Sequence, residues 1–307
     1  MVDFRYHLVS IVSVFFALAI GIVLGAGPLQ NSIAVGLNGQ VNSLRDSRES
    51  LRTELATKNQ QIESDKNAIL DMGSRLTKDS LAGKRVSIIV ATGAPNTVVE
   101  QARKSITDAG GRIAGEIVLT PSFSKAEAST YRSTLAGNLG GYIPQYVAGS
   151  TPEQTLGAAL DTILRGNPND QAPKTLITLL TSKDNQLIDV SAGVREPADA
   201  ILFISPDQLP SQEDKQSLSA SANDVYRATV EAMSKRGPLV SVGTTNDNKA
   251  FLLTLRNGAI GSTVDSAGTA TSQINIPLAL AQELAGKHVK YGSAQGADSI
   301  IGSVPGK

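Results

Sequence analysis

The pattern of hydrophobic and polar positions divides the chain into an apolar segment, a heptad segment and an alternating domain. Residues 8–27 carry no charge, and Ser10 and Ser13 are the polar side chains among them. Twenty helical residues rise about 30 Å, which matches the hydrocarbon core of a bilayer. We therefore predict a single transmembrane helix that forms a membrane anchor over residues 1–28.

The alternative for this segment is a cleaved signal peptide. Arg5 would then be its basic region, and residues 25–27 are small enough for a cleavage site. The apolar run is longer than the usual hydrophobic region of about 7–15 residues, and a helical pattern resumes soon after Pro28. Both observations favour a retained anchor.

Small residues recur at every fourth position of the predicted membrane helix. The set consists of Ser13, Ala17, Gly21 and Gly25. Small residues on one face let a second helix approach closely in lipid. We predict that this face is a packing surface of the membrane helix.

Residues 29–83 have the periodicity of a coiled coil. Apolar residues recur every seven positions in two series that are offset by three and four, as the a and d positions of a heptad are. The first series is Val41, Leu55, Ile62, Ile69 and Leu76, with Arg48 in its gap. The second is Leu37, Leu44, Leu51 and Met72, with Lys58 and Asp65 in its gaps. We call these positions the seam and predict that they bind a partner helix; the alternative is an amphipathic helix packed on its own domain.

Three charges within the seam bear on the identity of the partner. In a parallel homodimer each seam residue meets its own copy, so Arg48, Lys58 and Asp65 would each face a like charge. An unpaired buried charge is costly. We therefore predict a second envelope or membrane protein as the partner, with an antiparallel self-pair as the competing arrangement.

Residues 84–292 alternate between strand and helix patterns. The pattern predicts strands at 85–91, 112–119, 198–204, 239–242 and 262–264. It predicts helices at 96–109, capped by Asn96, and at 124–139, 151–165, 223–235, 251–255 and 276–285; residues 174–180 fit a strand or a short helix. Such alternation is typical of a three-layer, Rossmann-like α/β domain with a mainly parallel sheet. Residues 293–307, rich in Gly, Ser and Ala, are expected to form a flexible tail.

Composition narrows the chemistry. Lys and Arg together number 28, as do Asp and Glu, so the chain lacks the basic excess of a nucleic-acid binder. The absence of Cys excludes disulfides, thiolate metal sites and cysteine nucleophiles. His7, His288 and three Met do not have transition-metal spacing. We expect no enzymatic activity and no cofactor.

The turn at residues 92–96 is the position where doubly wound folds bind ligands. It lacks both G-x-G-x-x-G and G-K-[ST], so an ordinary turn is favoured over a nucleotide or sugar site. The glycines at 140–141 and the loop 243–247 fit an anion cradle, although glycine loops usually only turn. A lone His288 is more often a surface residue than a base.

Two blocks of the sequence resemble the MctB copper-transport family of mycobacteria and corynebacteria. The first is residues 6–25, YHLVSIVSVFFALAIGIVLG. The second is residues 264–270, VDSAGTA, followed by LALA at 278–281, Gly286, and Tyr291 with Gly292. The order of membrane segment, coiled coil and α/β domain matches over nearly the whole chain. Members usually carry Gly-His-Tyr-Gly in the final block, whereas residues 289–292 here are Val-Lys-Tyr-Gly.

The resemblance implies copper efflux or tolerance at the envelope of mycolic-acid bacteria, and some members are described as outer-membrane pores. It also implies a link to cell separation, because relatives act with a membrane partner on the control of peptidoglycan hydrolysis. A single helix does not line a channel by itself. The two resulting hypotheses are a membrane-anchored protein that serves copper efflux through protein–protein interaction, and a coiled-coil scaffold in cell separation. A role for copper is implied only by this resemblance.

The charges that flank the apolar segment predict the orientation. Arg5 precedes the span, and the first charge after it is Arg45. The positive-inside rule then places the N-terminus in the cytoplasm. We expect a single-pass protein of the cell membrane with its bulk outside the cytoplasm.

Overall fold

The computed structural model describes residues 4–26, 28–182, 185–190, 192–206, 221–245 and 251–306. The side chains of residues 26–38 lie outside this description, and so does the seam side chain of Leu37. Within the predicted loop 243–247, residues 246 and 247 also lie outside it. The contacts group the chain into two compact units, Met1–Asp65 and Lys66–Lys307.

Helix α1, Phe4–Ala26, contains the predicted apolar span. Its segment Phe4–Gly25 has a mean hydropathy of 2.7, and none of the span is buried inside the protein. By length and composition this helix is able to cross a membrane. A Cβ atom added at Gly21 or Gly25 would meet nothing within 4 Å, so the small-residue face is open.

Helix α2, Pro28–Thr77, is continuous through 50 residues. Five apolar seam residues of α2 lie in the first unit of the chain and are between 37% and 70% exposed: Val41, Leu44, Leu51, Leu55 and Ile62. Arg48, Lys58 and Asp65 are exposed as well. The helical part of the prediction is therefore confirmed over this segment, and pairing with another helix stays a prediction.

The end of α2 packs on the α/β domain of its own unit. Ile69 lies against the domain's hydrophobic core, and a Cβ atom added at Gly73 would stand 2.2 Å from Cδ1 of Ile274. Thr77 is buried, while Met72 is 64% exposed. Over these last turns the alternative of an amphipathic helix packed on its own domain describes the structure.

Seven strands form one sheet in the order β3-β2-β1-β4-β5-β6-β7. Their bounds are β1 Arg85–Val90, β2 Arg112–Leu119, β3 Ile188–Asp189, β4 Ala200–Ile204, β5 Leu239–Val242, β6 Ser262–Val264 and β7 Lys290–Tyr291. Neighbours pair in parallel apart from β2 and β3, which are antiparallel. The chain therefore turns to opposite sides of β1 when it forms β2 and later β4.

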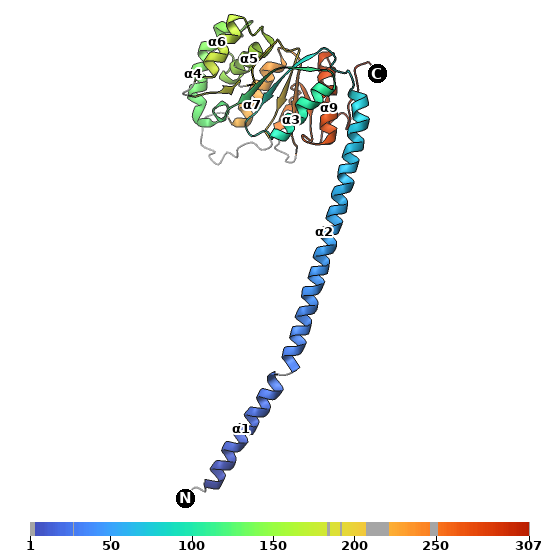
Figure 1. Cartoon of the computed structure of the whole chain (residues 1–307). Coiled ribbons are helices and arrows are strands. Elements are labelled where there is room, and N and C mark those ends of the chain that lie inside the picture. The colour runs from blue at the N-terminus through green and yellow to red at the C-terminus, as the bar shows by residue number, and fades with distance from the viewer. Residues whose placement is uncertain are drawn as a thin grey trace. The chain divides into compact units, whose positions relative to one another are not determined.

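Helices cover both faces of the sheet (Figure 1). One face carries α3, Asn96–Asp108, and α9, Ala270–Leu284. The other carries α4 Ser129–Leu139, α5 Pro152–Arg165, α6 Gln171–Leu180, α7 Ala222–Ser234 and α8 Phe251–Asn257. Side chains of β1 alternate between the two hydrophobic clusters: Ile88 joins the first face and Ile89 the second. A mixed α/β domain with a mostly parallel sheet is thus confirmed.

Several element ends differ from the prediction. The residue before α3 in the cap position is Pro95, and no side chain caps this helix, so the predicted role of Asn96 is wrong. α9 begins at Ala270 because the hydroxyl of Thr269 accepts a hydrogen bond from the Ser272 N–H at 3.2 Å. α4 begins at Ser129, after two single 3₁₀ turns. The segment 174–180, which fitted a strand or a helix, is part of a helix that begins at Gln171. The buried residues of this helix, Pro173, Leu176 and Leu180, follow helical spacing.

Residues 293–306, expected to be a flexible tail, lie against the domain through hydrogen bonds from α9. The Asn275 amide donates to the Ile300 carbonyl at 2.8 Å and accepts from the Gly302 N–H at 2.9 Å. Two turns further along, the Gln282 amide donates to the Ser303 carbonyl at 2.9 Å. The composition of the segment did not show these partners because they lie on a helix that precedes it.

We expect Gly73→Val to lower the free energy of unfolding of the full chain by about 1–3 kcal/mol, because the new side chain overlaps Ile274. The measurement is urea unfolding of detergent-solubilised protein. Gly39→Val is the matched control, since no atom lies within 4 Å of its added Cβ. Equal losses for both variants would show that the contact between α2 and α9 does not stabilise the domain.

Candidate functional site

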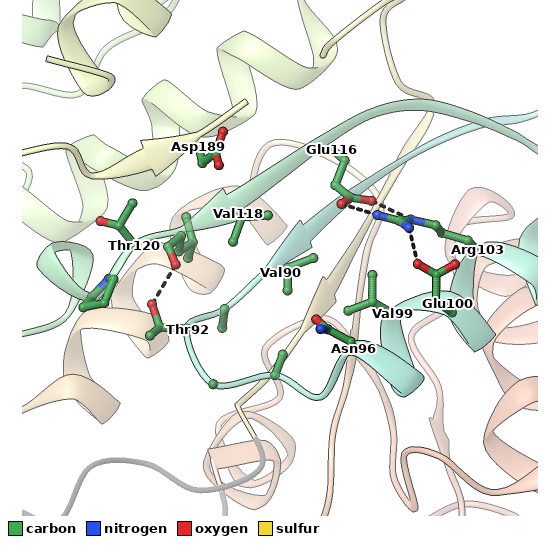
Figure 2. Close-up of a pocket in the computed structure, with 15 residues that line it drawn as sticks. Val90, Thr92, Asn96, Val99, Glu100, Arg103, Glu116, Val118, Thr120 and Asp189 are labelled. Atoms are coloured by element: carbon green, nitrogen blue, oxygen red, sulfur yellow. Dashed lines mark hydrogen bonds and ion pairs between the residues drawn. The ribbon is translucent and has the colours of Figure 1, made fainter. Parts of the chain in front are cut away.

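A pocket of about 430 Å³ lies where β1 and β2 end (Figure 2). The turn after β1 contributes Thr92 and Gly93, and α3 contributes Asn96 and Arg103. Carboxyl ends of parallel strands meet at one edge of a sheet, and α/β folds bind ligands there. The sequence analysis favoured an ordinary turn over a ligand site at residues 92–96, and in the structure this turn borders a pocket.

One wall of the pocket is a charged cluster. The guanidinium of Arg103 on α3 binds both carboxylate oxygens of Glu116 on β2, with Nε donating to Oε2 at 2.8 Å. Its Nη1 donates to Glu100, one turn earlier, at 2.5 Å. Glu116 is buried, and its hydrogen bonds raise the pKa of Arg103 above the ordinary arginine value. The cation therefore stays charged and is already shared between two carboxylates.

The other wall carries hydroxyl groups and Asp189 (Figure 2). The Thr92 hydroxyl donates to the Leu119 carbonyl at 2.7 Å, and that of Thr120 donates to the Gln186 carbonyl. Three carboxylates, those of Glu100, Glu116 and Asp189, thus line the pocket with Arg103 as the basic residue among its lining residues. Carboxylates outnumber basic groups among the described lining residues, which disfavours a phosphate group.

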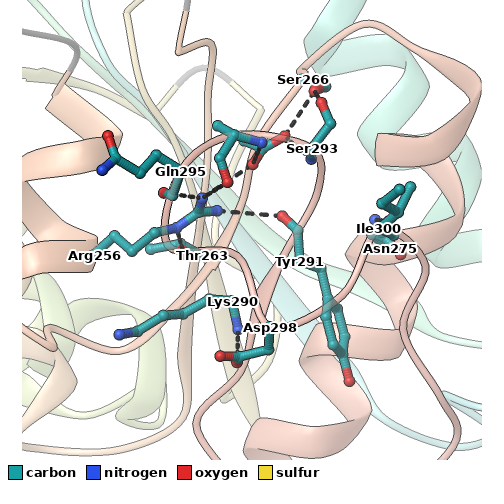
Figure 3. A network of polar contacts seen from close by, with 12 residues as sticks. Arg256, Thr263, Ser266, Asn275, Lys290, Tyr291, Ser293, Gln295, Asp298 and Ile300 are labelled. Carbon is teal, nitrogen blue, oxygen red and sulfur yellow. Dashed lines mark hydrogen bonds and ion pairs between the residues drawn. The ribbon is translucent and has the colours of Figure 1, made fainter. Parts of the chain in front are cut away.

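A second polar cluster lies where β6 and β7 end (Figure 3). Nη1 of Arg256 lies 3.1 Å from Oδ2 of Asp265, and both side chains are almost completely buried. The same guanidinium donates to the Thr263 hydroxyl and to the Tyr291 and Gln295 carbonyls, at 3.1, 3.3 and 3.2 Å. The buried cation is therefore both paired and hydrogen-bonded, which removes most of the cost of its burial.

Asp265 connects the two ends of the second sequence block. Its carboxylate accepts hydrogen bonds from the Ser266 hydroxyl at 2.7 Å and from the N–H groups of Ser293 and Ala294 at 2.9 and 3.0 Å. A Cβ atom at Gly292, whose φ is +131°, would stand 2.0 Å from Oδ1 of Asp265. The site therefore requires glycine at this position, and the arrangement supports a structural role for Asp265.

The pKa of Asp265 reflects these opposing effects. Burial by itself raises the pKa of the carboxyl group. The hydrogen bonds from Ser266, Ala294 and Ser293, together with the charge of Arg256, outweigh it, so the pKa lies below its ordinary value. The sequence analysis included Asp265 in the block 264–270. It did not identify Arg256, because this residue lies in a helix without a recognisable motif.

The candidate metal ligands do not come together. Nδ1 of His288 lies 2.8 Å from a carboxylate oxygen of Glu283, and its side chain is 69% exposed. Met233 is buried in the core, while Met72 is exposed on α2. Within the described ranges, no group of three or more His, Cys, Asp or Glu residues is placed to hold a metal ion.

The charged seam positions of α2 are separated along one helix and have no common pocket. Arg48, Lys58 and Asp65 are exposed, and Asp65 accepts a hydrogen bond from the Gln61 amide of its own helix at 3.0 Å. These groups are therefore accessible to another molecule.

Comparison with known proteins gives a match over nearly the whole sequence. A family model described as "Copper transport outer membrane protein, MctB" matches residues 1–301. Proteins named Copper transporter MctB from Mycobacterium tuberculosis and Mycobacterium bovis are 27% identical, over 98% of this chain and 99% of theirs. The protein of that name from Mycobacterium leprae is 26% identical over the same shares.

We expect Asp265→Asn to lower the free energy of unfolding by about 3–5 kcal/mol at neutral pH, because it leaves Arg256 buried without its counter-charge. A carboxyl group with a lowered folded pKa stabilises the fold above its unfolded pKa of about 3.9 and loses that effect as pH falls through the folded value. The difference between the two proteins should therefore shrink below about pH 4.

The measurement is the unfolding midpoint of the full chain in detergent from pH 3 to pH 7. Asp108→Asn is the control, because its ion pair with Lys104 is exposed and should contribute less than about 1 kcal/mol. A pH-independent difference for Asp265→Asn would contradict the assignment.

Proposed function

Because the chain belongs to the MctB copper-transport family, we propose that it is a single-pass, membrane-anchored envelope protein that serves copper efflux or tolerance by binding other proteins. In this proposal α1 spans the cell membrane, the N-terminus lies in the cytoplasm, and α2 and the α/β domain lie outside. The supporting domain is proposed to be Rossmann-like, on the basis of its strand order and of the pocket at the carboxyl edge of β1 and β2.

The observation that carries this proposal is the exposed apolar seam of α2. Leu44, Leu51, Leu55 and Ile62 recur at heptad positions and are each at least 60% exposed. Burial of apolar surface contributes about 25 cal/mol per Å², so a partner helix that covers this face would gain stability. The heptad spacing favours a coiled coil as the mode of binding.

Charge indicates the chemistry of the partner. In a parallel pair of α2 helices, Arg48 would face Arg48 and Lys58 would face Lys58. Both of these seam side chains are exposed. A helix from a different membrane or envelope protein would avoid this repulsion. It would carry acidic residues opposite Arg48 and Lys58 and a basic residue opposite Asp65.

Copper itself is proposed to move through the assembly, with this chain as a non-enzymatic component. The relatives are named copper transporters, whereas the His and Met side chains described in this chain do not converge. A lone α1 helix does not line a channel. The partner is therefore proposed to supply both the path and the copper ligands.

The second candidate function is a coiled-coil scaffold that binds a membrane partner and regulates cell separation through peptidoglycan hydrolysis. The same exposed seam favours it, because a tethered scaffold needs a docking helix and no chemistry of its own. The two functions differ in the phenotype that follows from loss of the protein.

We expect deletion of the gene to increase sensitivity to copper without producing chains of unseparated cells. Growth in graded copper and microscopy of the same cultures measure the two outcomes. Chaining with unchanged copper tolerance would replace the first function by the second, and neither phenotype would contradict both.

Complementation with Lys58→Glu tests the seam in the same strain. We expect this variant to fail, since its new carboxylate would repel the acidic partner residue. The double variant Thr53→Glu, Gln60→Glu changes the net charge by the same amount on the opposite face of α2 and should complement. Full complementation by Lys58→Glu at equal protein level in the membrane would contradict the partner proposal.

The orientation is tested separately by fusing alkaline phosphatase, which is active only outside the cytoplasm, after Lys307. We expect an active fusion. A stable, membrane-bound fusion without phosphatase activity would place the domain in the cytoplasm.

A further inference from the structure

The pocket at the carboxyl ends of β1 and β2 combines an apolar part with a surrounding polar part (Figure 2). Val90 of β1, Val118 of β2 and Val99 of α3 contribute apolar side chains to its lining. The polar groups come from the turn after β1, from α3 and from the ends of β2 and β3. The volume of about 430 Å³ lies near the lower end of the range of about 300–1,000 Å³ for ligand pockets, so the cavity fits a small molecule.

The polar side chains of this lining present mainly hydrogen-bond acceptors. The guanidinium of Arg103 donates to Glu100 and to both carboxylate oxygens of Glu116. The hydroxyls of Thr92 and Thr120 donate to backbone carbonyls. An ionised carboxylate has about four lone-pair sites, and a hydroxyl that donates is still able to accept. Acceptor capacity therefore remains on these oxygens, whereas the donors beside them are already engaged.

The charges of the lining disfavour ionic ligands of either sign. Glu100, Glu116 and Asp189 outnumber Arg103, which disfavours an anion. These carboxylates are not unpaired counter-charges for a cation, because Glu100 and Glu116 bind Arg103 and Asp189 also interacts within the protein. A neutral ligand with hydroxyl groups meets neither obstacle, since each O–H donates to an oxygen of the lining without adding charge.

We propose that this pocket binds a neutral, polyhydroxylated small molecule of the size of a monosaccharide. Its hydroxyl groups donate to Glu100, to Glu116 and to the two threonine oxygens, and its C–H face lies on Val90 and Val118. The amide of Asn96, which lines the same pocket, supplies donors and an acceptor for one further hydroxyl. The site is independent of the proposed binding of a partner by α2.

Asn96 and its neighbour Thr97 form a matched pair for the test. Within the described ranges the Asn96 amide has no hydrogen-bond partner and does not cap α3, so its removal costs the protein no hydrogen bond. Thr97 lies in the same turn of α3 and is likewise exposed, but it is not among the lining residues of the pocket.

The experiment is saturation-transfer NMR with the full chain in an amine-oxide detergent, which has no sugar headgroup. The neutral probes are D-glucose, D-galactose, D-mannose and D-arabinose, and the charged analogues are glucosamine and glucose phosphate. We expect saturable binding of at least one neutral sugar, and weaker binding of both charged analogues than of that sugar.

Asn96→Ala should weaken binding of that sugar by roughly threefold to tenfold, which corresponds to the loss of one hydrogen bond. Thr97→Ala should bind it as the unmodified protein does, and equal unfolding temperatures of the three proteins verify that the fold is retained. A lack of saturable binding for all of the neutral sugars, tighter binding of either charged analogue, or equal affinities of Asn96→Ala and the unmodified protein would each overturn the proposal.

Discussion

Exposed apolar surface on α1 and α2 is the physical constraint on which the proposed role of the first unit depends. α1 presents an apolar surface all round with none of its span buried, and an isolated helix of this kind is stable in lipid rather than in water. α2 presents a narrower apolar face between charged positions, which is the width that one further helix covers. Both helices leave apolar side chains exposed in the described structure, and this is why the proposed role rests on binding.

The α/β domain follows the opposite rule, because its buried polar groups are largely matched from within. Glu116 on β2 has Arg103 on α3, and Asp265 after β6 has Arg256 and two N–H groups of the following segment. Each pair connects a helix to a strand or to the residue that follows a strand. The sequence block that resembles the MctB family is thus partly explained by structure, since Gly292 leaves room for the carboxylate that holds the C-terminal segment. Arg132 differs from Arg103 and Arg256, because its guanidinium donates to the backbone carbonyls of Ser122 and Lys125 and has no carboxylate partner.

The pocket at β1 and β2 shows how charge limits what an α/β edge can bind. Its position is that of a nucleotide site, but its carboxylates outnumber its basic group. The fold alone would suggest a phosphate-binding site, but the carboxylates that line the pocket disfavour a phosphate group. The family is named for copper transport. The described His, Cys, Asp and Glu side chains form no group of three or more that could hold a metal ion. For these reasons the proposed function rests on binding by α2 and not on chemistry of this domain.

Local patterns determined much of the fold. The uncharged run, the heptads and the alternation of β-branched strands with capped helices each reflect interactions between residues close in sequence, so α1, α2, the β1-α3-β2 unit and the start of α5 at Pro152 were predictable. In the pocket, the turn at Thr92 was predictable for the same reason. The sequence did not indicate that α2 ends against Ile274, that residues 293–306 bind Asn275 and Gln282, or that Arg103 faces Glu116. These contacts join groups whose positions are set only when the sheet and its helices have packed. Tertiary structure alone decided which charges are paired, that the buried Arg132 donates to the Ser122 and Lys125 carbonyls, and which part of the seam is already covered.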